Sequence, residues 1–225
     1  GLPQAEFAGT EIRLALEARG SGCLGGTLDD LAKASGNVRI VLAASAAEAK
    51  RLTADLGLAP LKASAAQSYA LCKKVDGGRT TYAVLATDPT GAMYGGLDVA
   101  EAVRLGTLAD LKDSDHAPHI ERRGIKFNIP LDARTPSYSD AGDAAQQNIP
   151  EMWSMDFWRE MLDEMARQRF NVLTLWNLHP FPSLVKVPEY PDVALADVMR
   201  TTVKLDSTYS LSGQDMVRPA HLASL

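Results

Sequence analysis

The first half of the chain alternates between apolar patterns typical of strands and of helices. Apolar side chains at every second position, Ile12, Leu14 and Leu16, predict a half-buried strand over residues 10–18. Periodicity and capping residues predict the elements that follow: a short helix over 27–36, a buried strand over 37–45, a helix over 45–58, a hairpin over 67–88 with its turn at 76–78, and a helix over 89–106. This order predicts an α/β fold: a small α/β sandwich, one sheet with helices on one face.

A charged segment over residues 108–121 contains Pro118 and is typical of a linker. We therefore expect two domains, the sandwich over 1–117 and a second domain over 118–225.

The second domain opens with a strand–helix–strand pattern. Strands are predicted over 122–132 and 171–178, with an amphipathic helix over 154–170 between them. The inner face of that helix is predicted to consist of Phe157, Met161, Leu162, Met165 and Ala166. A strand, helix and strand in this order form a parallel pair with a right-handed crossover. A long polar loop is predicted over 133–150, and the tail over 201–225 is expected to be loop with one short helix near 215–222.

The composition excludes several classes of function. A net charge of −5 gives no support for nucleic-acid binding, which needs a basic patch. No apolar run approaches the roughly 20 residues of a membrane span, so no membrane partner is expected. The segment "DPTGAMYGG" (88–96) lacks the ending of a phosphate-binding loop. Cys23 and Cys72 lie at no metal spacing and are predicted to be two buried thiols, with a disulfide as the alternative. We expect no cofactor and no metal.

Polar and aromatic residues follow both strands of the predicted βαβ unit. The first strand leads to Asp132 and Arg134, and the second ends on Trp176, Asn177 and His179. The carboxyl ends of parallel strands meet at one edge of the sheet, where ligands of α/β proteins bind. Hydrogen-bonding groups beside an aromatic ring suit a sugar, so these five residues are the predicted substrate-binding site.

Each of these residues also has a purely structural explanation. Asp132 and Arg134 could cap the loop or pair with each other, Trp176 could belong to the core, and His179 could brace the turn before Pro180.

Three motifs resemble the glycoside hydrolases related to β-hexosaminidases (family 20) and α-glucuronidases (family 67). The segment "TDPTGAMYGGLDVAEAVR" resembles a sandwich-domain motif at Gly91, Tyr94 and Gly95. The segment "RRGIKFNIPLDAR" resembles the first barrel strand at Arg123, Gly124, Asp132 and Arg134, with an insertion before Asp132, and "LDEMARQRFNVLTLW" resembles the next helix and strand. The likeness covers roughly residues 10–182.

The resemblance implies a sandwich domain followed by the first βα units of an incomplete (β/α)8 barrel. It also implies that Arg134 holds sugar hydroxyls and that Asn177 and His179 line the site. The 107 residues after Pro118 are too few for a barrel, which takes about 250 residues. No stretch matches the catalytic acid pair, so the catalytic residues are left unassigned and expected outside this chain.

The expected function is therefore that of an N-terminal fragment of a glycoside hydrolase that uses carboxylic acid catalysis. The fragment is expected to be inactive alone, to bind an oligosaccharide or glycoside, and to need the rest of the barrel from its parent chain. Polysaccharide degradation suggests a periplasmic or secreted location, although "GLPQAEF" at the start has no signal-peptide pattern. The alternative is a non-catalytic carbohydrate-binding or docking α/β module.

Overall fold

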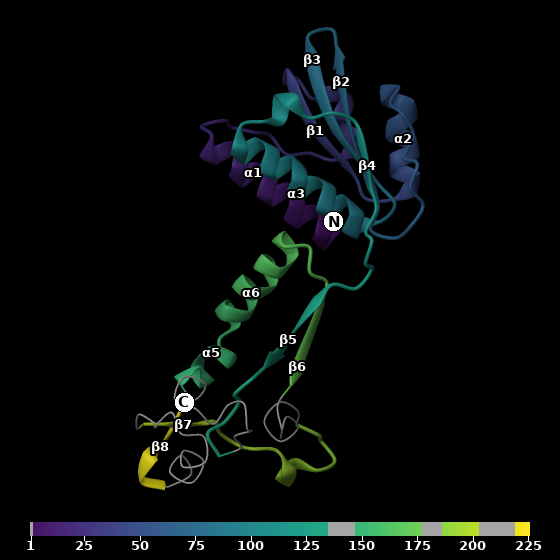
Figure 1. Ribbon diagram of the computed structural model, residues 1–225. Coiled ribbons are helices and arrows are strands. Elements are labelled where there is room, and N and C mark those ends of the chain that lie inside the picture. The colour runs from purple at the N-terminus through teal and green to yellow at the C-terminus, as the bar shows by residue number, and fades with distance from the viewer. Residues whose placement is uncertain (1, 135–146, 177–185, 203–218) are drawn as a thin grey trace. The chain divides into compact units, whose positions relative to one another are not determined.

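The computed structural model describes residues 2–134, 147–176, 186–202 and 219–225. It divides into two compact units, Gly1–Glu121 and Arg122–Leu225. Both are built from helices and strands (Figure 1). The α/β class predicted from the sequence is confirmed, and the described residues form no closed barrel.

The first unit contains a four-stranded sheet in the order β1-β3-β2-β4. Its strands are β1 (Val38–Ala43), β2 (Tyr69–Asp76), β3 (Arg79–Ala86) and β4 (Ser114–His116). β1 runs parallel to β3, whereas β2 is antiparallel to both of its neighbours. The predicted hairpin is confirmed: β2 and β3 join through Gly77 and Gly78, both with positive φ.

Helices cover both faces of this sheet, which corrects the expectation of helices on one face. One face packs against α1 (Pro3–Ala18) and α3 (Pro89–Leu105), and the other packs against α2 (Ala46–Leu56) and the 3-10 helix η1 (Leu28–Lys33) (Figure 1). Both faces of the strands are apolar: Val84 and Ala86 of β3 face α1 and α3, while Ala83 and Leu85 face α2. A strand that is apolar on both faces must be covered on both sides.

The strand predicted over residues 10–18 is wrong, because this segment belongs to helix α1. The residues it buries are Ala8, Glu11, Ile12 and Ala15, which follow the helical period of three to four. Leu14 is 43% exposed, so the alternation that suggested a strand does not match the buried face. Glu11 is buried because it forms an ion pair with Arg104 of α3.

The two long helices after β1 begin and end as predicted. Ser45 caps α2 by accepting a hydrogen bond from the backbone N–H of Glu48, and Gly57 ends it in the left-handed region. Asp88 caps α3 in the same way, through the backbone N–H of Gly91. Its other carboxylate oxygen accepts from the backbone N–H of Gln67 at 2.7 Å, which ties the start of α3 to the segment before β2.

Close packing of α3 explains why glycine occurs at two of its positions. A Cβ at Gly91 would overlap the backbone carbonyl oxygen of Ser68, and one at Gly95 would overlap Val84 and Tyr69. The helix therefore lies closer to the sheet than any side chain at these positions would allow.

The predicted linker 108–121 is wrong over part of its length. It contains the 3-10 helix η2 (Leu108–Asp110) and β4, which pairs with β2 at the edge of the sheet. β4 consists of Ser, Asp and His, so it has no apolar pattern. It is anchored by His116, whose ring stacks on Tyr69 with centroids 4.7 Å apart.

The second unit begins with the predicted βαβ arrangement. β5 (Gly124–Asn128) and β6 (Val172–Trp176) are parallel neighbours, and α6 (Met155–Arg167), capped by Ser154, lies between them in sequence. A short helix, α5 (Ile149–Met152), precedes α6 and begins at the end of the predicted loop 133–150. The packed residues around β5 are Phe127, Ile129, Leu131, Met152, Trp153, Phe157 and Trp158. Leu162, predicted on the inner face of α6, is 49% exposed.

The amino ends of β5 and β6 are held together by specific hydrogen bonds. The backbone N–H of Arg123 donates to Oδ1 of Asn171 at 2.8 Å, and the backbone N–H of Asn171 donates back to the carbonyl of Arg123 at 2.7 Å. Nε of Arg123 donates to the carbonyl of Arg169, which has a positive φ of 62°. A Cβ at Gly124 would overlap the backbone of Val172. These contacts fix the register of the parallel pair at this end.

In the described part of the tail, a short 3-10 helix lies within the range 215–222 where a short helix was predicted, and a strand that was not predicted follows it. The rest of the predicted loop, residues 203–218, lies outside the described residues. β7 (Met199–Thr201) and β8 (Leu222–Ser224) are antiparallel, and the short 3-10 helices η3 (Pro191–Val193) and η4 (Pro219–His221) lie nearby in sequence. Strands of three residues pair with segments far away in the chain, so their own sequence carries no periodic signal.

Both cysteines are free, so the disulfide alternative is wrong for this structure. Cys72 is buried as predicted, but Cys23 is exposed in the glycine-rich segment after α1. Within the described ranges, no helix is long and apolar enough to cross a bilayer.

Candidate functional site

Asp132 lies four residues beyond the end of β5, and its side chain is completely buried. Oδ1 accepts hydrogen bonds from the backbone N–H of Arg134 at 2.8 Å and from its Nε at 2.9 Å. Oδ2 accepts from Nη2 of Arg134 at 2.8 Å and from the backbone N–H of Met199 at 2.9 Å. The pairing of Asp132 with Arg134 that the sequence left open is therefore present.

Arg134 is held by two carboxylates. Besides its bonds to Asp132, Nη2 donates to Oδ1 of Asp197 at 3.0 Å and to the Asp197 carbonyl at 3.1 Å. The Arg134 side chain is 31% exposed. Among the residues that the structure describes, none accepts a hydrogen bond from Nη1. The guanidinium is thus fixed in position and retains two donors.

The electrostatics of this pair follow from its hydrogen bonds. Burial alone would raise the pKa of Asp132. The hydrogen bonds from the side chain of Arg134 and from the backbone of Met199 and Arg134 outweigh burial, so the pKa of Asp132 lies below its ordinary value. The pKa of Arg134 is raised, chiefly by its hydrogen bonds to Asp132 and against the effect of burial. Both groups are charged at neutral pH.

The backbone around Asp132 is fixed on both sides. The carbonyl of Leu131 accepts a hydrogen bond from Nε1 of Trp153 at 2.9 Å, and the backbone N–H of Ala133 donates to the carbonyl of Met199 at 2.9 Å. Leu131 and Ile129 are each 1% exposed. The segment that carries Arg134 therefore belongs to the core of the second unit.

Trp176, the last residue of β6, is half-buried and is the register partner of Asn128 in β5. Nζ of Lys126 lies over its ring, 5.0 Å from the centroid. This is a cation–π contact, which fixes both side chains.

Three residues near the site were missed from the sequence. Lys126 and Asn128 alternate with Phe127, which packs toward α6, so both point to the opposite face of the strand pair. Oδ1 of Asn128 is buried and finds no hydrogen-bond partner in the described ranges. The polar positions between Ile125, Phe127 and Ile129 were the available signal. Asp197, in contrast, is 63 residues from Arg134 and carried no local signal.

Of the five predicted site residues, the structure brings Asp132 and Arg134 into direct contact and places Trp176 at the end of the neighbouring strand. Asn177 and His179 lie outside the described residues. Across the described ranges, no group of three or more His, Cys, Asp or Glu side chains could hold a metal ion. Among the described residues, Asp132 and Asp197 are the carboxylates that Arg134 engages.

Comparison with protein-family models and with curated proteins gives no match. Among solved structures, the chain is similar to a protein described as a GH138 enzyme targeting pectin rhamnogalacturonan II. The TM-score is 0.56 and the identity is 21%, over 96% of this chain and 27% of that chain. The chain therefore has an α/β fold like that of part of a glycoside hydrolase, and it spans about a quarter of the length of that protein.

Proposed function

We propose that this chain is the front part of a carbohydrate-active glycoside hydrolase, in which the βαβ unit of residues 122–176 begins a (β/α)8 barrel. The likeness to a glycoside hydrolase over both units supports this proposal. The motif resemblance to β-hexosaminidases and α-glucuronidases supports it independently, and it suggests these two groups as the relatives to test first. The substrate would be an oligosaccharide or glycoside, and polysaccharide degradation would suit a periplasmic or secreted protein.

The observation that carries the proposal is the fixed guanidinium of Arg134 beyond the carboxyl end of β5. Ligands of α/β barrels bind at this end of the strands. Asp132 and Asp197 orient Arg134, while Nη1 donates to none of the described residues and the side chain is partly exposed. An oriented donor pair suits neighbouring sugar hydroxyls, which accept hydrogen bonds without a change of charge. In this arrangement Arg134 binds substrate and Asp132 positions it.

The catalytic acids are proposed to lie outside this chain. Glycosidic cleavage needs a carboxylic acid that is protonated when the leaving oxygen departs, and that requires a raised pKa. Asp132 has a lowered pKa and no exposed side-chain surface, so it does not meet this requirement. Asp197 is paired with Arg134 at 3.0 Å.

Trp176 is proposed as the aromatic wall of the same site, with Asn177 and His179 as further sugar contacts. An indole ring offers an apolar face for the C–H groups of a sugar. Lys126 over the ring keeps Trp176 in one orientation.

The test uses the full-length polypeptide that contains this chain. Release of reducing sugars would be measured across acidic and neutral polysaccharides, with circular dichroism confirming that each variant folds. Arg134→Ala is expected to lower kcat/KM by about 100-fold, as loss of a positioning contact does. The matched control is Arg159→Ala, which removes an exposed arginine of α6 and should leave kcat/KM unchanged.

Two outcomes would count against the proposal. Full activity of Arg134→Ala would remove Arg134 from the site. Sugar binding without any turnover by the full-length protein would favour the alternative, a non-catalytic carbohydrate-binding module.

A further inference from the structure

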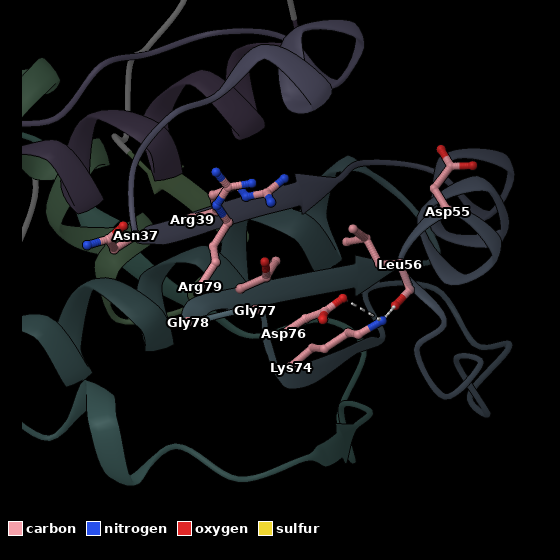
Figure 2. Close-up of a pocket in the computed structure, with 10 residues that line it drawn as sticks. Asn37, Arg39, Asp55, Leu56, Lys74, Asp76, Gly77, Gly78 and Arg79 are labelled. Atoms are coloured by element: carbon pink, nitrogen blue, oxygen red, sulfur yellow. Dashed lines mark hydrogen bonds and ion pairs between the residues drawn. The ribbon is translucent and has the colours of Figure 1, made fainter.

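The first unit contains a hollow of about 360 Å³ on the face of the sheet that α2 covers. It opens where α2 ends, and the apolar positions of that face give way to polar ones. The residues around it are Asn37, Arg39, Asp55, Leu56, Lys74, Asp76, Gly77, Gly78, Arg79 and Thr81 (Figure 2). Its size lies at the lower end of the range of small-molecule sites.

Two guanidinium groups meet at this hollow. Arg39 of β1 is the register partner of Thr81, and Arg79 lies two residues before Thr81 on β3, so both arginines project from the same face. Figure 2 shows the two guanidinium groups side by side. The pKa of Arg39 is lowered, first by burial and then by the positive charge of Arg79.

Both arginines have donors left over. Nη1 of Arg39 donates to the Leu31 carbonyl at 3.2 Å, but its Nε is buried and has no hydrogen-bond partner among the residues that the structure describes. Nε of Arg79 donates to the Gly36 carbonyl at 3.0 Å. A buried donor without an acceptor is unfavourable by about 1–3 kcal/mol. Arg39 would therefore be stabilised by an added acceptor.

The other charged groups around the hollow have partners of their own. Asp76 lies 3.9 Å from Nζ of Lys74, and Asp55 lies 3.5 Å from Nε of Arg51. Lys74 also donates to the carbonyl of Leu56 at the end of α2. Within the described part of the chain, no carboxylate lies within ion-pair distance of Arg39 or Arg79. Neither arginine is therefore paired with a carboxylate of the described residues, and the two carboxylates that line the hollow, Asp55 and Asp76, face other cations.

We propose that this hollow binds an oxyanion between Arg39 and Arg79, supplied either as the carboxylate of an acidic sugar or as a free inorganic oxyanion. Guanidinium groups bind carboxylates and phosphates through paired, charge-assisted hydrogen bonds. A bound anion would separate the two positive charges and supply an acceptor to Nε of Arg39. Asn37 and Thr81 also line the hollow and add polar groups that suit sugar hydroxyls. The site lies wholly in the first unit and does not depend on the proposed catalytic function.

The experiment is an NMR titration of the 225-residue chain with galacturonate, galactose and inorganic phosphate at constant ionic strength. Galacturonate and galactose differ by the carboxylate, so they isolate its contribution. Galacturonate is expected to shift the Nε–H signals of Arg39 and Arg79 and the amides of Gly77 and Gly78, while galactose leaves them unchanged. Tighter binding of galacturonate than of phosphate would identify an acidic sugar, and the reverse would identify a free oxyanion.

Variants separate this site from general charge effects. Arg79→Gln is expected to weaken binding about tenfold or more, the loss typical of a hydrogen bond to a charged group. The control Arg13→Gln removes one exposed arginine of α1 and should leave the affinity unchanged. Arg39→Gln tests the buried partner, and Arg79→Gln carries the test if that variant does not fold. The proposal would be overturned if neither anion shifted the NMR signals, or if Arg79→Gln and the unsubstituted chain bound the anion equally well.

Discussion

Arg134 and Asp132 form a two-point ion pair, with Nε donating to Oδ1 at 2.9 Å and Nη2 donating to Oδ2 at 2.8 Å. Asp132 is fully buried, whereas Arg134 is partly exposed. The same carboxylate accepts the backbone N–H of Met199 and so joins the segment after β5 to β7. One side chain therefore both orients a candidate binding group and holds the tail of the unit in place.

Replacement of this carboxylate should destabilise the second unit. Asp132→Asn keeps the shape but loses the charge, and it puts an amide donor where donors from Arg134 and Met199 now converge. Removing one member of a buried pair costs about 3–5 kcal/mol, and retained hydrogen bonds should reduce this to about 2–4 kcal/mol. Urea unfolding would measure the change. The matched variant Asp197→Asn, whose side chain is 41% exposed, should cost about 1 kcal/mol or less; equal losses in the two would contradict the assignment.

The same pair predicts a dependence of stability on pH. Because the pKa of Asp132 is lower in the folded chain than in the unfolded chain, the stabilisation is present at pH values above the unfolded pKa, which is about 4. It is lost as the pH falls through the folded value. The free energy of unfolding of the unsubstituted chain should therefore decline more steeply below about pH 4 than that of the Asp132→Asn variant. Parallel curves would show that Asp132 does not contribute.

Two glycines in helices should respond in opposite directions to alanine. Gly91→Ala would force its Cβ into the carbonyl oxygen of Ser68 and should destabilise the first unit by about 1–3 kcal/mol. At Gly9, in the middle of α1, a Cβ meets nothing within 4 Å, so Gly9→Ala should stabilise by about 0.5–1 kcal/mol. Thermal unfolding of both variants would test this pair. Destabilisation by Gly9→Ala would show that α1 packs differently.

The two thiols should differ in reactivity. Cys23 is exposed, whereas Cys72 is 4% exposed, and burial, reinforced by Asp113 and Asp115, raises its pKa to about 11. Because the thiolate is the nucleophile, a disulfide reagent at neutral pH should modify one thiol quickly and the second only after denaturation. Cys23→Ser should abolish the fast phase, and Cys72→Ser should leave it unchanged. Two fast thiols in the parent would contradict the buried position of Cys72.

The elements that the sequence predicted well have capping or turn residues at their own ends. Ser45 and Gly57 bound α2, Asp88 begins α3, and Gly77-Gly78 makes the hairpin turn. The sequence predicted a strand in place of α1 because one residue of the buried helix face, Glu11, is charged and therefore did not count as a core position. Glu11 is buried through its ion pair with Arg104, which is 93 residues away. Such a long-range partner leaves no local pattern.

The candidate site likewise combines contacts between residues close in sequence with contacts between distant ones. The proximity of Asp132 and Arg134 is a property of two positions in one loop, and their pairing was one of the two explanations open from the sequence. Asp197 and the backbone of Met199 complete the arrangement from the far end of the unit. The contact between Lys126 and Trp176 depends on the register of β5 and β6. That register is known only once the two strands are paired in the structure.

The amino end of the βαβ unit gives the fold room for evolutionary change. Arg123 and Asn171 lock β5 and β6 in register through reciprocal hydrogen bonds, and Gly124 permits the close approach of Val172. Strand register is therefore secured at the end remote from Arg134 and Trp176. Descendants of this sequence can therefore exchange residues at the carboxyl ends without losing the alignment of the two strands.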